Sequence, residues 1–124
     1  MKPTAIWTDA PETDDYPAAR DFLSLIMSDA KAAALAAKLK KGRLVRRKAK
    51  DILRASGVKL LPRDNPRVAH NLKKVRTGRP MSPVLLVRGD RERNIPLTIA
   101  DGYHRVCASW YIDENTLIPC RLAS

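Results

Sequence analysis

The second half of the chain alternates between short apolar runs and helix-like patterns. Four apolar runs predict strands, over residues 58–61, 83–87, 95–100 and 117–122. Two segments with apolar residues at helical spacing predict helices, over residues 66–77 and 103–112. Asn65 is a potential cap for the first of these helices, with Pro66 at its first position. This half is therefore predicted to mix strands and helices.

The first half is predicted to be helical after an irregular start. Residues 1–17 hold three prolines and many acids, so they are expected to form an extended acidic arm. Apolar positions within 18–27 predict one helix, and Ser28 can cap a second, alanine-rich helix over 30–41; a single helix with a bend also fits this pattern. A third helix is expected after Gly42, because Leu44, Val45, Ala49, Ile52 and Leu53 recur at helical spacing. The predicted organisation is an arm over 1–17, a helical basic region over 18–57 and an α/β domain over 58–124.

Charge changes this picture in the helical region. The chain carries 24 Lys and Arg residues against 13 Asp and Glu residues, a net charge of +11. Residues 1–29 are acidic, whereas all nine charged residues from Ala30 to Lys50 are basic. A concentrated positive potential attracts polyanions, which suggests DNA contacts by Lys40, Lys41, Arg43, Arg46 and Arg47. The alternative is that these are solvated helix faces, or that the acidic head folds onto them within the chain or in a homodimer.

Membrane and disulfide classes are not expected. No run of about 18 apolar residues is present, and the N-terminus lacks a basic region followed by an apolar stretch, so we expect a cytoplasmic protein without a membrane partner. Cys107 and Cys120 cannot form a disulfide framework or, without a Cys/His cluster, a zinc site. Both are expected to be packed thiols.

Asp101-Gly102-Tyr103-His104-Arg105 joins a predicted strand to a predicted helix through a glycine turn. The first amides of a helix have no helical acceptor, and its dipole is positive at that end, so such a corner attracts anions. Arg105 can bind phosphate oxygens, and His104 can donate to one or pass on a proton. The alternative is structural: Arg105 pairs with an acid, His104 is half-buried and Tyr103 is packed.

At this point the sequence resembles the superfamily of the ParB N-terminal domain and sulfiredoxin. Those families share a helix, a glycine, a "Pro-Ile-x-Val"-like strand, a second strand, a Gly-Glu-Arg-Arg or Gly-Gly-Cys-His-Arg box opening a helix, and a last strand. The matching segments here are residues 68–75, Gly78, 83–87, 96–100, the 101–105 box with Ala108, and 118–122, preceded by a proline-rich lead-in over 61–67. The resemblance covers about Val58 to Ser124 and implies a small mixed sheet.

The resemblance also implies a nucleotide-phosphate pocket, since ParB-type domains bind CTP and sulfiredoxin uses ATP. Gly102 would be the close-approach glycine, with Tyr103, His104 and Arg105 beside the phosphates. Asp101 would be an acid that holds Mg²⁺ or orients a hydroxyl, which with His104 makes up the expected catalytic pair. Relatives that phosphorylate free serine carry an Asp-Gly-His-His-Arg box, which differs only at Tyr103. The expected cofactor is thus ATP or CTP with Mg²⁺.

Two departures limit what can be carried over. Tyr103 stands where sulfiredoxin has its reactive cysteine, so sulfinic acid reduction is not expected. The helix-turn-helix domain of chromosome-partitioning ParB proteins is not expected here, since the resemblance already extends to Ser124. Outside the box, Asp64 is either a second acid for phosphoryl transfer or a turn residue, and His70 faces either solvent or the pocket.

Three functions follow as hypotheses. The first is a nucleotide-binding domain, with phosphotransfer or nucleotide hydrolysis as its extension. The second is a partition-like accessory protein that binds DNA through the basic stretch, with the helical region packed on the domain or mediating self-association. The third is a ParB-like nuclease, which ranks lower because phosphodiester hydrolysis usually needs two or more metal-binding acids and only Asp101 lies near the box.

Overall fold

The computed structural model describes residues 3–124 and has a mixed α/β fold, as predicted. Its five helices within that range are α1 (Asp15–Leu23), α2 (Asp29–Lys41), α3 (Ala49–Ser56), α4 (Pro66–Arg76) and α5 (Tyr103–Ile112). Its four strands are β1 (Leu44–Lys48), β2 (Val84–Val87), β3 (Thr98–Asp101) and β4 (Leu117–Ala123). None of the helices described over this range has the length and apolar character needed to cross a bilayer.

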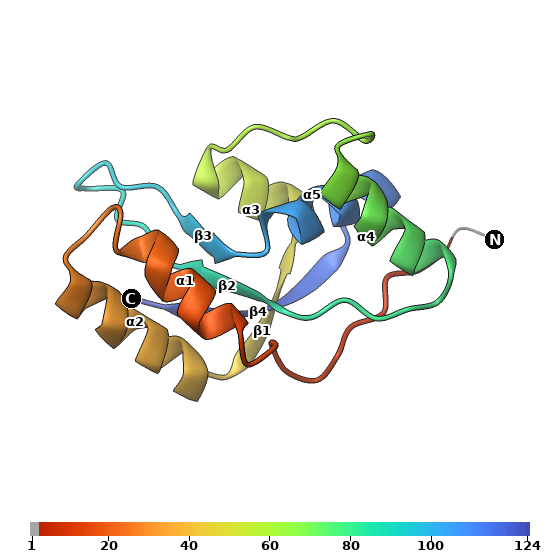
Figure 1. Cartoon of the computed structure of the whole chain (residues 1–124). Helices are drawn as coiled ribbons and strands as arrows, with labels where there is room; N and C mark the ends of the chain where they lie inside the picture. Colours follow the sequence, from red (N-terminus) through yellow and green to blue (C-terminus); the bar gives the residue numbers. More distant parts are fainter. Residues whose placement is uncertain (1–2) are drawn as a thin grey trace.

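The strands form one mixed sheet in the order β1-β4-β2-β3. β4 pairs antiparallel with β1 and parallel with β2, and β2 pairs antiparallel with β3. Helices cover both faces of the sheet, with α1 and α2 on one side and α3, α4 and α5 on the other (Figure 1). The β2–β3 connection turns tightly, through an antiparallel bridge between Asp90 and Ile95.

Burial on both faces explains why β2 is apolar at every position. Val84 and Leu86 pack with α3, α4 and α5, whereas Leu85 and Val87 pack with α1 and α2. Side chains alternate between the faces of a strand, so a strand sandwiched between two helical layers needs a continuous apolar run. This is the run that predicted a buried strand over 83–87.

Several local predictions are confirmed by their caps. The Ser28 side chain accepts a hydrogen bond from the Lys31 N–H at 3.2 Å and begins α2. The Asn65 side chain accepts from the amides of Arg67 and Val68, and Pro66 occupies the first turn of α4. The arm is irregular as far as Asp14, apart from one bridge between Trp7 and Met81. Its predicted end at residue 17 is wrong, because residues 15–17 form the start of α1. Residues 1–2 of the predicted arm lie outside the described range.

Two local predictions are wrong. Residues 44–48 form strand β1, not the start of a helix, because β4 offers them a five-residue antiparallel ladder from Leu44–Arg121 to Lys48–Leu117. The helix of this region, α3, begins only at Ala49. Residues 58–61 form no strand either, and Leu60 and Leu61 instead pack half-buried against the core from an irregular segment. In both cases tertiary packing overrides the local pattern.

Candidate functional site

The turn from β3 into α5 is built around Gly102. Its φ of 108° lies in the left-handed region that favours glycine. A Cβ at this position would also lie 2.4 Å from Cγ1 of Val84, so the turn presses against β2. Gly102 thus approaches the Val84 side chain closely, and its approach to a phosphate stays a prediction.

Arg105 is bound inside the protein. Its Nη1 donates to the carbonyls of Ser82 at 2.6 Å and Pro83 at 3.0 Å, and also to the Ser82 hydroxyl. Its Nη2 forms an ion pair with Asp101 at 2.6 Å. A second carboxylate, that of Asp15 at the start of α1, lies 3.8 Å from Nη1. The guanidinium predicted to hold a phosphate is thus an internal ion pair that ties α5 to β3, to the irregular segment just before β2 and to α1.

This cluster has two carboxylates for one guanidinium. The pKa of Asp101 is raised to about 6: burial is the largest cause, the charge of Arg105 acts in the opposite direction, and the nearby charge of Asp15 adds to the rise. The side chains of Asp101 and Asp15 are only 22% and 17% exposed. Asp101 therefore keeps its proton to a higher pH than an ordinary aspartate does.

The raised pKa of Asp101 predicts a pH dependence of stability. The folded chain binds this proton more tightly than the unfolded chain, so the contribution is present below about pH 4 and is lost as pH rises through about 6. The Asp15→Asn variant removes the repulsion between the two carboxylates, so the pKa of Asp101 should fall. The loss of unfolding free energy from pH 4 to pH 7 should then be about 1 kcal/mol smaller in the variant than in the unmodified chain. Urea unfolding at the two pH values measures this difference.

Asp14→Asn is the matched control for this measurement, because Asp14 is exposed and its side chain makes no capping hydrogen bond. It removes the same charge one residue away from the cluster. If both variants change the pH dependence equally, the effect comes from net charge and the pairing of Asp15 with Asp101 does not matter.

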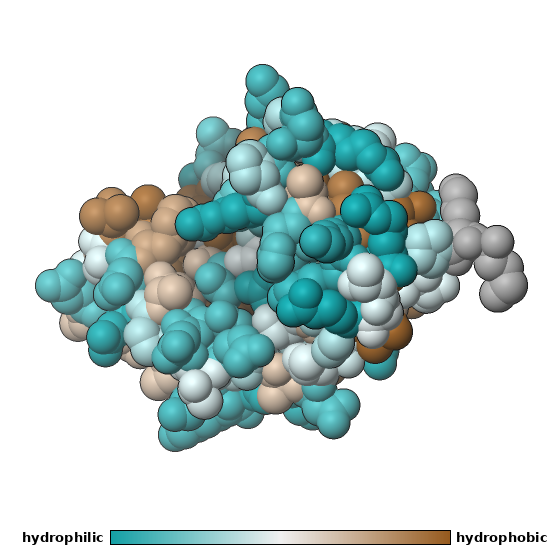
Figure 2. Space-filling view, turned by 45° about the vertical axis from the view of Figure 1, so that its right-hand side comes forward, coloured by the Kyte–Doolittle hydropathy of each residue, from teal (hydrophilic) through white to brown (hydrophobic). Residues whose placement is uncertain are grey.

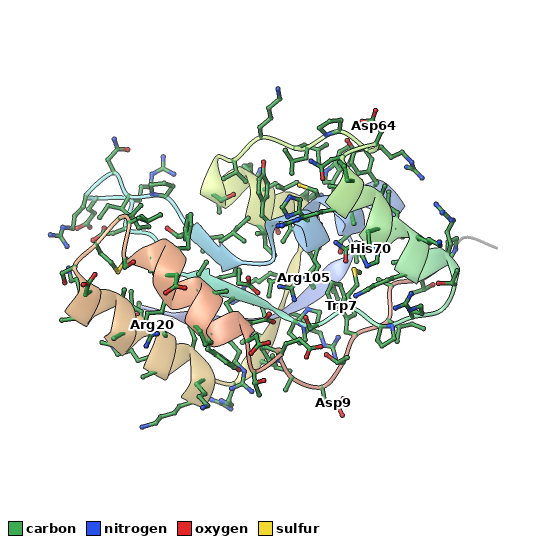
Figure 3. The ribbon with its side chains drawn as sticks, in the orientation of Figure 1. Trp7, Asp9, Arg20, Asp64, His70 and Arg105 are labelled. Atoms are coloured by element: carbon green, nitrogen blue, oxygen red, sulfur yellow. The ribbon has the colours of Figure 1, made fainter. Side chains whose placement is uncertain are left out.

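A polar pocket of about 420 Å³ opens beside this cluster, between α4 and the start of α5. We call it the α4–α5 pocket; its lining is Glu12, Arg67, His70, Asn71, Lys74, Pro80, Ser82, Asp101, Gly102, His104 and Arg105. Figure 3 shows His70 on α4 close to Arg105. The face of the molecule that carries α4 is mainly hydrophilic (Figure 2).

Hydrogen-bond donors converge on the α4–α5 pocket from two helices, and two of them, Arg67 and Lys74 on α4, are cations. Arg67, His70 and Lys74 are spaced three and four residues apart, so they share one face of α4. From the other side come His104 and the amides of the first turn of α5, and within residues 3–124 no backbone carbonyl accepts from the amides of residues 103–105. The pocket therefore offers hydrogen-bond donors and positive charge to an anion.

His104 and Tyr103 differ in their relation to the pocket. Partial burial, together with the charge of Arg67, lowers the pKa of His104, so the ring is largely neutral at pH 7 and offers one N–H donor. The Tyr103 hydroxyl donates to the carbonyl of Lys59, and Tyr103 is not part of the lining. The structure brings His104 to the pocket and does not bring Tyr103 there.

Asp64 and His70 also differ in their relation to the α4–α5 pocket. Asp64 is exposed at the outer side of the loop before α4, away from Arg105 (Figure 3), and does not line the pocket. His70 lines the pocket while staying exposed. Sequence reasoning missed Arg67, Asn71 and Lys74, although their spacing over one face of the predicted helix is a visible signal. Asn71 is buried and its amide donates to the Arg67 carbonyl at 3.0 Å.

The two cysteines are buried, as predicted, and the described residues hold no disulfide between them. Burial raises the pKa of Cys107 and raises that of Cys120 to about 11, so both stay protonated thiols at neutral pH. Neither lines the α4–α5 pocket. Both belong to the core between the sheet and α3, α4 and α5.

The carboxylates near the box are a poor match for Mg²⁺. Asp101 already holds the guanidinium through its Oδ2 at 2.6 Å, and Asp15 lies beside the same cation. From Pro3 to Ser124 no group of three or more His, Cys, Asp or Glu side chains is arranged to hold a metal ion. Metal binding by Asp101 stays a prediction that this donor set does not favour.

The basic stretch lies away from the α4–α5 pocket. Lys40, Lys41, Arg43, Arg46 and Arg47 are exposed, on the last turn of α2, the connection after it and strand β1. In the part of the chain described, none of them comes within 4.0 Å of a carboxylate. Of the acids in residues 3–29, Asp15 forms an ion pair with Arg105, and none forms one with these five cations.

Comparison of this chain with protein-family models, with curated proteins and with solved structures finds no match.

Proposed function

We propose that the α4–α5 pocket binds the phosphate groups of a nucleoside triphosphate. The observation that carries this proposal is the convergence of Arg67, His70 and Lys74 with His104 on the free amides that begin α5. The lining contains no aromatic residue apart from its two histidines, and only Glu12 and Asp101 are acidic. Such a surface suits phosphate oxygens better than a base, so the base is expected to lie at the mouth of the pocket.

The roles of the box residues follow from their contacts. His104 and the amides of α5 face the ligand, whereas Arg105 holds the turn in place and is a positioning residue. The resemblance of the 101–105 box to ParB-type and sulfiredoxin boxes points to the same class of ligand. Phosphotransfer by Asp101 would require it to leave Arg105, so the proposal is for binding, without a metal-dependent step.

Removing two cations from α4 tests the proposal. In Arg67→Ala/Lys74→Ala we expect the Kd for ATP, CTP or inorganic tripolyphosphate to rise about 100-fold, because each lost charge-assisted hydrogen bond is worth about 1.4 kcal/mol or more. Isothermal titration calorimetry on the full chain measures the change, and adenosine or cytidine alone should bind at least as weakly as the variant binds the triphosphates.

The matched control is Lys73→Ala/Arg76→Ala. It also removes one lysine and one arginine from α4, but at exposed positions outside the pocket lining. Its affinity should stay within about threefold of the unmodified chain. Equal losses in the two double variants, or no measurable binding of any triphosphate to the unmodified chain, would overturn the proposal.

A further inference from the structure

A second positive surface runs from the last turn of α2, through the connection that follows, into β1, which is an edge strand of the sheet. Its members are Lys40, Lys41, Arg43, Arg46 and Arg47, which we call the basic edge. We infer that the basic edge binds the phosphate backbone of duplex DNA. This inference is independent of the nucleotide proposed for the α4–α5 pocket, because the two surfaces share no residue.

Structural reasons account for part of this charge. Lysines in the last turn of α2 interact favourably with the helix dipole, and charges on an edge strand discourage pairing with another chain. Neither reason requires every charged residue of β1 to be basic, since acids can also protect an edge. All charged residues from Ala30 to Lys50 are nevertheless basic. Their mutual repulsion is unfavourable unless an anion is bound nearby.

The basic edge is also held rigidly. Arg121 on β4 donates to the carbonyls of Lys40 at 2.8 Å and Gly42 at 2.6 Å, which caps the end of α2 and fixes it to the sheet. β1 itself is fixed by its five-residue ladder with β4. Cations on a fixed scaffold lose little backbone entropy on binding, unlike those of a disordered basic tail.

The dimensions and side chains favour a duplex. The five residues of β1 span roughly 16 Å, along which B-DNA presents a phosphate every 1.7 Å or so of its axis. No aromatic residue lies between Ala30 and Lys50 to stack on unpaired bases, which single-strand recognition usually needs. Contacts would therefore be to phosphates, and binding should show little sequence preference.

Fluorescence anisotropy with a labelled duplex of about 30 base pairs tests the inference on the full chain. If the five cations each contact a phosphate, log K should fall against log salt with a slope of about −4.5, roughly a 500-fold loss of affinity between 50 and 200 mM. Arg46→Ala/Arg47→Ala should make the slope less steep by about 1.8. Arg91→Ala/Arg93→Ala removes two exposed arginines from the β2–β3 turn, beyond the other edge of the sheet, and should leave the slope unchanged.

Each other outcome counts against the inference. Equal loss in the two arginine pairs would show an effect of net charge alone, and binding that is insensitive to salt would exclude backbone contacts. Tighter binding of single-stranded DNA or duplex RNA would assign the surface to another nucleic acid. Arg67→Ala/Lys74→Ala must keep its DNA affinity; if it loses that affinity, DNA occupies the α4–α5 pocket. Unchanged melting temperatures confirm that each variant is folded.

Discussion

Arg105→Ala is expected to lower the free energy of unfolding by about 3–5 kcal/mol. The substitution removes the cation shared by two largely buried carboxylates, and it leaves the carbonyls of Ser82 and Pro83 without their donor. Unpaired buried charges and unsatisfied polar groups are among the few mechanisms that produce effects of this size. Urea denaturation, or a fall in melting temperature where the transition is reversible, measures the loss.

Arg54→Ala provides the comparison for this prediction. Arg54 also pairs with an aspartate, Asp51, but the Arg54 side chain is 87% exposed and its Nη2 lies 3.6 Å from Oδ1 of Asp51. Its removal should change stability by less than about 1 kcal/mol. A similar small effect for Arg105→Ala would mean that the internal ion pair contributes nothing to folding and that the guanidinium is available to a ligand.

Gly102→Ala is expected to cost about 3 kcal/mol or more. Two effects add at this position, because the residue has a φ of 108° and because the new Cβ would lie 2.4 Å from Cγ1 of Val84. A left-handed conformation costs an alanine about 1–2 kcal/mol, and overpacking a buried contact costs a further 1–3 kcal/mol or so. The shift in the urea midpoint at constant m-value measures the sum.

Gly57→Ala separates the two effects. Gly57 also has a positive φ, of 68°, at the end of α3, but a Cβ there would have no heavy atom within 4 Å. Only the conformational cost of about 1 kcal/mol should remain. If the two glycines give equal losses, the contact between the turn and Val84 is relaxed at no cost, and the glycine at the start of α5 is explained by its backbone alone.

The sequence pattern predicted the elements that depend on their own residues. The caps at Ser28 and Asn65 and the apolar run over 83–87 each contain their physical reason locally, and the structure confirms them. The prediction for residues 44–48 was wrong because Val45 lies four residues before Ala49, the first residue of α3. The apolar residues of strand β1 and of helix α3 therefore follow one helical spacing. What makes residues 44–48 a strand is β4, more than 60 residues away in the sequence.

The candidate site also combines features that have a local signal in the sequence with features that only the fold creates. The corner at residues 101–105 could be located from its glycine. Pairing of Arg105 with an acid was one of the alternatives, but Asp101, four residues away, was not named as that acid. The carbonyl of Ser82 and the carboxylate of Asp15 could not be found in this way, because only the fold brings them to Arg105. The spacing of Arg67, Asn71 and Lys74 is a local signal that they share one face of α4. That this face lines a pocket depends on the packing of α4 beside α5, which the sequence pattern does not show.

The position of β4 in the sheet determines when the protein can fold. β4 is the neighbour of both β1 and β2, so β1 has no strand to pair with until residues 117–123 have been synthesised. During translation the basic residues of β1 therefore emerge from the ribosome long before their partner strand. Helices α2 and α4 can form early from local contacts, whereas closing the sheet is a late step that links segments far apart in the chain.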